Sequence, residues 1–286
     1  MFIHWFPGHM TKAIRMMKQE VAVVDSIIYV LDARAPLSCI NEAFEEVIAN
    51  KPRIYVLNKC DLADSDELAQ WVKYFKKLAP CIAADSLTRA DTRELLASLT
   101  ELNAPLIQKY KAKGVARTIR AMVIGVPNSG KSTLINSLTK GKKTITGNRP
   151  GVTRGKQWVS IGKHIDLLDS PGVLFPDFKD QQKAVRLAII GSIKDDILDI
   201  TELGLEAVKF LMQNYPQRLQ ERYCAQFSEE TPAIDVMNAV AAKRGFLQKD
   251  GDTDYEKTGR AIITDIRKGY LGKLVLEKVS DGSFIL

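Results

Sequence analysis

The chain has 286 residues, of which 45% are hydrophobic and 26% are charged, and its formal net charge is +7. This composition is typical of a folded globular protein, and the length suits one large domain or two ordinary ones. No apolar run reaches the roughly 18 residues of a membrane-spanning helix, and the first residues lack the pattern of a secretion signal. We therefore expect a cytoplasmic protein without a membrane partner, and the positive charge favours a polyanionic partner such as RNA.

The first half of the chain alternates helix-like and strand-like segments. Residues 10–24 carry apolar side chains at helical spacing, whereas residues 26–31 are apolar on both faces, as in a buried strand. The alternation continues with predicted helices at 41–49, 65–78 and 91–102 and predicted strands at 53–57 and 81–84. Such alternation predicts an α/β fold with a mainly parallel sheet that is covered on both faces. Residues 103–117 break the rhythm, and we interpret them as a connector within the same domain.

The second of these strands ends in Asn58-Lys59-Cys60-Asp61, which fits the pattern N-K-x-D. A carboxylate at Asp61 can accept hydrogen bonds from N1–H and the 2-amino group of guanine, and adenine offers neither donor. Asn58 suits the other edge of the base, and the stem of Lys59 can cover its ring face. Alone, the pattern also fits a surface turn. Ser86, after the third strand, is a candidate for backbone contact with the guanine carbonyl.

Residues 125–132 read Gly-Val-Pro-Asn-Ser-Gly-Lys-Ser and fit the phosphate-binding pattern G-x-x-x-x-G-K-[ST]. A predicted strand at 118–124 precedes them and a predicted helix at 132–139 follows, which is the context that this loop requires. Backbone N–H groups and the helix N-terminus would hold the phosphates. Lys131 would reach the β- and γ-phosphates, and Ser132 would bind Mg²⁺. The other predicted contacts from this loop are Pro127, Asn128, Ser129, Gly130 and Thr133.

A third motif follows a predicted hairpin of strands at 157–161 and 164–168. The second strand ends in Asp169-Ser-Pro-Gly172, which fits D-x-x-G but also fits a plain turn. In the first interpretation Asp169 holds Mg²⁺ through water, and the N–H of Gly172 faces the γ-phosphate. Thr153 is our choice for the threonine that closes over Mg²⁺, and Thr144 and Thr146 remain competitors.

Helical periodicity dominates from about residue 177 onward. Helices are predicted at 181–190, 202–213, 217–224, 233–243 and 254–270. We therefore predict one domain at 1–177 and a small helical domain at 178–286. In the last helix, one arc is predicted to be core and holds Ile262, Ile263, Ile266 and Tyr270. The opposite arc holds Lys257, Arg260, Arg267 and Lys268, and it suits either a phosphate backbone or a merely solvated face.

The order of the motifs is a circular permutation, because N-K-x-D precedes the phosphate loop instead of following it. With these motifs, Trp5-Phe-Pro-Gly-His-Met10, Asp32-Ala-Arg-Ala-Pro36 and Pro150-Gly-Val-Thr153, the chain resembles the ribosome biogenesis GTPase A family of circularly permuted bacterial GTPases. The resemblance extends over essentially the whole chain. It implies a GTPase that acts late in the assembly of the large ribosomal subunit, with a helical C-terminal domain that contacts rRNA.

Catalysis needs a group that orients the attacking water, which in many GTPases is a Gln just after D-x-x-G. That position is Val173 here, and the resemblance implies such a hydrophobic residue together with His9 as a replacement in catalysis. Alternatively, His9 packs against the following helix. Asn128 is similar to the K⁺ ligand of potassium-dependent GTPases, or it only hydrogen-bonds within its loop. The predicted catalytic residues are thus His9, Lys131 and Thr153, with GTP, Mg²⁺ and K⁺ bound.

We expect a monomer whose unassisted turnover is slow, on the order of 10⁻⁴ to 10⁻² s⁻¹, and is raised by the large subunit. One alternative is a GTP-dependent regulator of another RNA, such as tRNA. A different class of alternative is a non-catalytic assembly scaffold whose shape is set by nucleotide.

Overall fold

The computed structural model describes residues 3, 10–85, 89–139, 158–161, 164–170 and 180–279. The chain forms two compact units. The first, here called the sheet unit, comprises Phe6–Pro176 and Glu277–Leu286, and the second, here called the helical unit, comprises Met1–Trp5 and Asp177–Leu276. The helical unit is thus largely a single insertion into the chain of the sheet unit.

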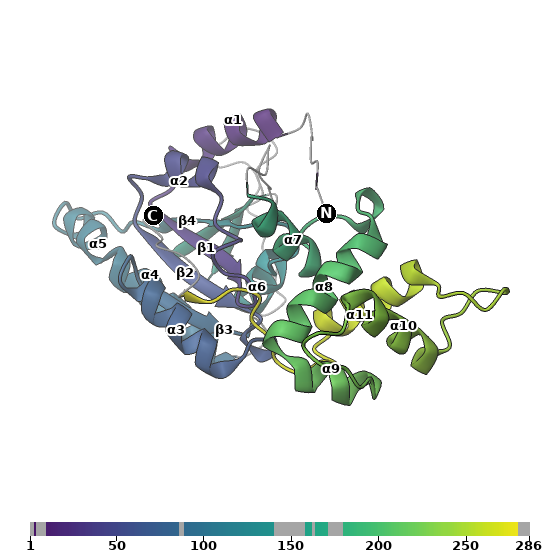
Figure 1. Ribbon diagram of the computed structural model, residues 1–286. Helices are drawn as coiled ribbons and strands as arrows, with labels where there is room; N and C mark the ends of the chain where they lie inside the picture. Colours follow the sequence, from purple (N-terminus) through teal and green to yellow (C-terminus); the bar gives the residue numbers. More distant parts are fainter. Residues whose placement is uncertain are drawn as a thin grey trace. The chain divides into compact units, whose positions relative to one another are not determined.

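A six-stranded sheet with the order β3-β2-β1-β4-β6-β5 forms the centre of the sheet unit (Figure 1). Its strands are β1 (Ser26–Asp32), β2 (Arg53–Asn58), β3 (Cys81–Ala84), β4 (Ile119–Ile124), β5 (Trp158–Ile161) and β6 (Ile165–Asp169). Neighbouring strands are parallel except β5 and β6, which form the predicted antiparallel hairpin. Every residue of β1 is buried, as its unbroken apolar run predicts. The mainly parallel α/β fold is confirmed.

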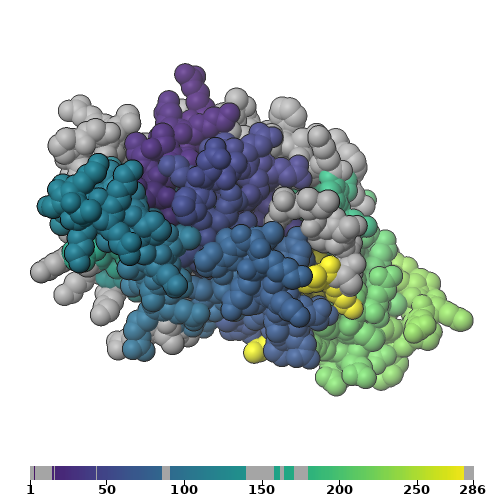
Figure 2. Space-filling model, turned by 90° about the vertical axis from the view of Figure 1, so that its left-hand side faces the viewer, coloured from purple at the N-terminus to yellow at the C-terminus, as the bar shows by residue number. Residues whose placement is uncertain are grey.

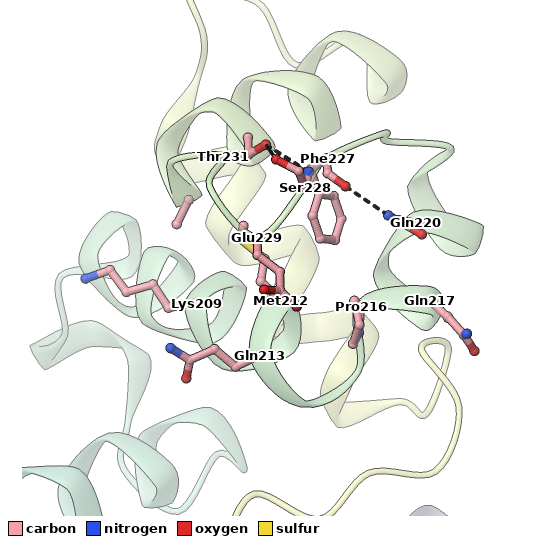
Figure 3. A pocket seen from close by; sticks show the side chains of 11 residues that line it. Lys209, Met212, Gln213, Pro216, Gln217, Gln220, Phe227, Ser228, Glu229 and Thr231 are labelled. Carbon is pink, nitrogen blue, oxygen red and sulfur yellow. Dashed lines mark hydrogen bonds between the residues drawn. The ribbon is translucent and has the colours of Figure 1, made fainter.

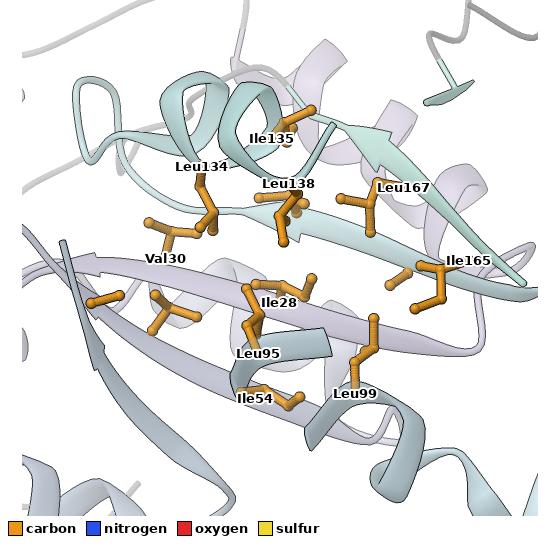
Figure 4. Close-up of a cluster of buried hydrophobic side chains, with 14 of the residues drawn as sticks. Ile28, Val30, Ile54, Leu95, Leu99, Leu134, Ile135, Leu138, Ile165 and Leu167 are labelled. Carbon is orange, nitrogen blue, oxygen red and sulfur yellow. The ribbon is translucent and has the colours of Figure 1, made fainter. Parts of the chain in front are cut away.

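Helices cover this sheet, and one core cluster shows how they are held. The helices are α1 (Met10–Val21), α2 (Glu42–Ile48), α3 (Ser65–Lys76), α4 (Arg89–Leu102), α5 (Ala104–Lys111) and α6 (Lys131–Leu138). Leu99 of α4 and Leu134 of α6 pack with Ile28 of β1 in a buried cluster (Figure 4). Tyr29 points to the opposite face, because side chains alternate along a strand, and stacks there on Tyr55.

Helix α5 lies in the segment 103–117, which we interpreted as a connector within one domain, and the whole segment belongs to the sheet unit. The helix begins directly after Asn103, and Pro105 occupies its first turn. Proline is well tolerated there, because the missing N–H has no partner within a helix and the fixed φ suits the turn. Figure 2 shows residues of this helix on the surface, in teal. The chain then turns at Gly114, whose φ is +70°, before it enters β4.

The helical unit contains five α-helices in its described residues. They are α7 (Gln181–Ile189), α8 (Ile200–Asn214), α9 (Pro216–Tyr223), α10 (Ala233–Arg244) and α11 (Tyr255–Arg267). Helices α8 and α11 approach closely through Gly204 and Gly259, since a Cβ added to Gly259 would lie 2.6 Å from the carbonyl oxygen of Ile200. In the part of the chain that the structure describes, helices with the length and hydropathy of a membrane span are absent.

The chain returns to the sheet unit at Glu277, which is buried. Its carboxylate accepts hydrogen bonds from the backbone N–H of Leu37 (2.5 Å) and from the N–H (3.1 Å) and hydroxyl (2.5 Å) of Ser38. The indole N–H of Trp71 donates to the carbonyl oxygen of Glu277 at 3.1 Å. Because Leu37 and Ser38 follow β1, this residue fixes the chain near the carboxyl end of that strand.

Candidate nucleotide site

Three predicted motifs meet at one edge of the sheet. N-K-x-D follows β2, the phosphate loop follows β4, and Asp169 ends β6. These strands and β1 run parallel in the order β2-β1-β4-β6, so their carboxyl ends share one edge. The side-chain amide of Asn58 donates to the carbonyl oxygen of Ser129 at 2.7 Å, and both residues are buried. This bond joins the guanine motif directly to the phosphate loop, although the two residues are 71 positions apart.

The phosphate loop has a backbone that only certain residues can adopt. The φ angles are +154° at Gly125 and +96° at Gly130, and Asn128 is left-handed at +60°. A Cβ on Gly125 would overlap the carbonyl oxygen of Val30 and would lie 3.0 Å from the hydroxyl of Ser129. The loop therefore lies directly against β1, and α6 begins at its end. The N-terminus of α6 favours an anion through its unpaired N–H groups and its dipole.

Lys131 is buried at the centre of this loop. Its ammonium donates to the carbonyl oxygens of Gly125 (3.1 Å) and Val126 (2.9 Å). Burial lowers the pKa of Lys131 to about 8, although the nearby carboxylate of Asp169 opposes this effect. Among the described residues, two neutral carbonyl oxygens accept hydrogen bonds from this buried cation, and it lies beside a glycine cradle that a Cβ would fill. This arrangement fits a phosphate chain. Ser132 and Thr133 are exposed in the first turn of α6.

The guanine motif is held by a buried ion pair that sequence reasoning missed. The ammonium of Lys59 lies 2.9 Å from Oδ2 of Asp32, and Arg34 donates to the same carboxylate through Nε (2.9 Å) and Nη2 (2.7 Å). Burial alone would raise the pKa of Asp32, but Arg34 and Lys59 outweigh it and hold this pKa at about 2. Lys59 is therefore anchored by a charged carboxylate. The available signal was a charged pair at the end of an apolar strand next to the N-K-x-D strand.

The remaining predicted site residues divide into two groups. Asp61 lies exposed in a short 3₁₀ helix (Cys60–Leu62), where its carboxylate can meet a base from solvent. Ser132, in the first turn of α6, and Asp169, at the end of β6, offer oxygen atoms, which are the ligands that Mg²⁺ prefers. The predicted residues that lie outside the described part of the chain are His9, Ser86, Thr144, Thr146, Thr153, Gly172 and Val173. Their assignments stay predictions.

Known GTPases resemble this chain in sequence and in structure. The family model described as 50S ribosome-binding GTPase matches residues 120–239. The chain is 43% identical over 284 residues to ribosome biogenesis GTPase A of Bacillus licheniformis, covering 98% of this chain and 100% of the relative. It is 34% identical over 302 residues to mitochondrial ribosome-associated GTPase 1 of Ictalurus punctatus, covering 96% and 92% respectively.

Solved structures give the same result. The GDP-bound structure of TM YlqF has a TM-score of 0.69 and 26% identity to this chain, with 93% of this chain and 100% of that chain covered. The sequence identity extends across both the sheet unit and the helical unit, with the same nearly complete coverage of the relatives. The chain therefore belongs to the ribosome biogenesis GTPase A family.

Proposed function

We propose that this GTPase acts in the assembly of the large ribosomal subunit, and that the subunit accelerates a slow intrinsic hydrolysis of GTP. The observation that carries the GTPase part is the bond between Asn58 and Ser129, because it couples a guanine-reading strand end to a phosphate loop. The large subunit is supported by the description of the matching family model, which names the 50S ribosome. The chain would work as a cytoplasmic monomer.

Each proposed contact uses a chemical property of the side chain. Asp61 accepts the two guanine donors, Asn58 holds the other edge, and Lys59 covers the ring while Asp32 anchors it. Lys131 neutralises the β- and γ-phosphates. The other proposed nucleotide contacts are Ser86, Pro127, Asn128, Ser129, Gly130, Thr133 and Gly172.

Metal ions are proposed at two positions around the phosphates. Ser132, Asp169 and Thr153 would hold Mg²⁺, which draws negative charge from the phosphate oxygens when bound. Asn128 is exposed in the loop with a left-handed backbone, so its side chain can face a cation beside the γ-phosphate. We assign it to K⁺. Val173 cannot orient water, and we assign that role to His9.

The organisation into domains is also a proposal. We assign GTP hydrolysis to residues 1–177 and contact with rRNA to residues 178–286. The sequence shift near residue 177, from alternating strands and helices to helices alone, supports this division.

The decisive experiment measures phosphate release from GTP by the full chain, with and without large subunits, in K⁺ and in Na⁺. We expect stimulation by the subunits and faster hydrolysis in K⁺. His9→Ala should abolish most of the stimulated rate, whereas His164→Ala, at an exposed histidine before β6, is the matched control and should not. Phosphate release that large subunits do not raise would refute the proposed function, and equal rates in both salts would remove the potassium site.

A further inference from the structure

The helical unit carries a cluster of cations and aromatic rings that the nucleotide site does not use. Its centre is Asp265 in the last turn of α11, which is buried. Oδ2 of Asp265 accepts hydrogen bonds from Nε of Arg222 (2.7 Å), the hydroxyl of Tyr223 (3.0 Å) and Nη2 of Arg244 (3.1 Å). Arg222 and Arg244 lie in the last turns of α9 and α10, and the three helices lie together in Figure 1. We call Arg222, Arg244, Asp265 and Tyr270 the Asp265 cluster.

Two arginines share one carboxylate in this cluster, so its net charge is positive. Within the described residues, Arg222 donates hydrogen bonds only through Nε and Arg244 only through Nη2. Their side chains remain 32% and 34% exposed, so the other guanidinium N–H groups can reach an external acceptor. Guanidinium groups match the geometry of phosphate oxygens. Because Asp265 already fixes both side chains, binding a phosphate here would cost little side-chain entropy.

Tyr270 adds an exposed aromatic face to these cations. The helical arc predicted Tyr270 to be core, and this is wrong, because α11 ends at Arg267 and Tyr270 is 56% exposed. Its ring centre lies 5.3 Å from the guanidinium carbon of Arg222 and 6.0 Å from the ammonium of Lys268. An exposed ring beside fixed arginines is the arrangement on which proteins stack an unpaired base next to its phosphate.

Other surfaces of the helical unit suit a phosphate less well. Arg267, which we placed on an arc suited either to a phosphate backbone or to solvent, instead has a structural role, since it donates to Asp195 (2.8 and 2.9 Å) and to the carbonyl oxygens of Ala188 and Ile189. A pocket of about 730 Å³ lies beside α8 and α9, and the carboxylate of Glu229 lines it (Figure 3). That carboxylate would repel a phosphate. Gln217 and Gln220 of α9 line the pocket, whereas Arg222 lies on the opposite side of this helix.

We propose that the Asp265 cluster binds an unpaired nucleotide of RNA, with the base stacked on Tyr270 and its phosphate held by Arg222 and Arg244. The inference rests on the proposed function, because it supplies a chemical contact with the RNA of the ribosomal partner. It narrows that contact to single-stranded RNA, since a base within a duplex does not expose its face to a tyrosine ring.

The test measures binding of the full chain to a fluorescent single-stranded RNA and to a hairpin of the same length. The wild type should prefer the single strand. Tyr270→Ala should weaken single-strand binding about tenfold, because base stacking contributes about 1–3 kcal/mol, whereas Tyr270→Phe keeps a ring and should stay within about twofold. Arg222→Gln should weaken binding and reduce the slope of log affinity against log salt by about 0.7. Lys209→Gln, at an exposed lysine of α8 paired with Glu206, removes one positive charge elsewhere on the helical unit and should change affinity less than about twofold.

Three results would overturn the inference: equal binding of hairpin and single strand, unchanged single-strand affinity in Tyr270→Ala, or equal losses in Arg222→Gln and Lys209→Gln. GDP affinity and the thermal midpoint of each variant are measured in parallel, so that a folding defect is recognised. If Tyr270→Ala has such a defect, the comparison of Arg222→Gln with Lys209→Gln decides. Stimulation of GTP hydrolysis by large subunits is measured for the wild type in the same series. If stimulation is present but Tyr270→Ala binds single strands normally, this inference fails alone, and if stimulation is absent the proposed function fails.

Discussion

The buried carboxylate of Asp32 gives the sharpest prediction about this protein, because it serves both the fold and the site. Asp32 is 1% exposed, Arg34 is 2% exposed, and the two are joined by contacts of 2.7 and 2.9 Å. Asp32→Asn keeps the shape of the side chain but removes its charge. Arg34 then remains buried opposite a neutral amide, and Lys59 loses the charge that anchors it.

The magnitude follows from two independent considerations. Lowering the pKa of Asp32 from 3.8 to about 2 corresponds to roughly 2–3 kcal/mol in favour of the charged form. Removing one partner of a buried ion pair costs about 3–5 kcal/mol, because the other charge is left uncompensated. We therefore expect Asp32→Asn to lower the free energy of unfolding by about 3 kcal/mol at pH 7. GDP affinity should fall as well, since Lys59 is no longer fixed.

Urea unfolding followed by tryptophan fluorescence measures the loss. The matched control is Glu256→Gln, which breaks an exposed pair with Arg260 and should cost less than about 0.5 kcal/mol. Adding Arg34→Met to Asp32→Asn should restore at least about 1 kcal/mol, because the uncompensated charge is then removed. A loss below about 1 kcal/mol in Asp32→Asn, or no recovery in the double variant, would refute the argument.

The pH dependence gives a second check on the same residue. The folded pKa of Asp32, about 2, lies below the unfolded value of 3.8. The contribution of this charge to stability is therefore complete above pH 3.8 and is lost as the pH falls through about 2. Asp32→Asn should remove that part of the acid destabilisation, and the difference in stability between wild type and variant should shrink as the pH falls from 4 to 2.

Three further predictions concern the nucleotide. Asp61→Asn should weaken binding of GDP and strengthen binding of xanthosine diphosphate (XDP), because the 2-oxygen of xanthine needs a hydrogen-bond donor. Calorimetry measures both affinities, and Asp66→Asn on α3 is the control. Gly125→Ala should abolish GDP binding and lower the thermal midpoint, because its Cβ would overlap the carbonyl oxygen of Val30; normal binding would refute this. Because burial holds the pKa of Lys131 at about 8 and a phosphate favours its charged form, GDP affinity should fall as the pH rises above 8, and proton uptake should appear in calorimetry in two buffers. In the protein without nucleotide, stability has the opposite pH dependence. Because burial lowers the pKa of Lys131 from 10.5 to about 8, the free energy of unfolding should rise with pH between these two values.

Features that depend on local sequence were predictable. An unbroken apolar run such as residues 27–31 indicates either a strand buried on both faces or a buried helix, and its length of five residues favours the strand. The phosphate loop was also predictable from local sequence, because its glycines and Lys131 lie close together in the chain. The bounds of β3 agree with the predicted range, and those of most helices differ by a few residues.

Features that depend on where an element ends, or on which strands are neighbours, were not predictable. Tyr270 falls on the apolar arc only if α11 continues beyond Arg267. A helical-wheel projection does not show where a helix ends. The guanidinium of Arg267 donates hydrogen bonds to Asp195, which lies 72 residues away in the sequence. The anchoring of Lys59 by Asp32 requires β1 and β2 to be adjacent with Asp32 opposite Asn58, and this register is a property of the sheet.

The positions of the strands in the sheet also explain why the site can form although the order of the motifs along the chain is permuted. The contacts that build it are lateral ones between neighbouring strand ends: Asp32 of β1 reaches the N-K-x-D side, Val30 of β1 abuts Gly125 of the phosphate loop, and the Asn58 amide reaches Ser129. None of these contacts depends on which strand the chain visits first. Because all four strands are parallel, each delivers its carboxyl end to the same edge whatever the connections are. A permutation that keeps the order β2-β1-β4-β6 therefore keeps the site, whereas a strand order that placed further strands between β2 and β4 would separate the guanine motif from the phosphate loop.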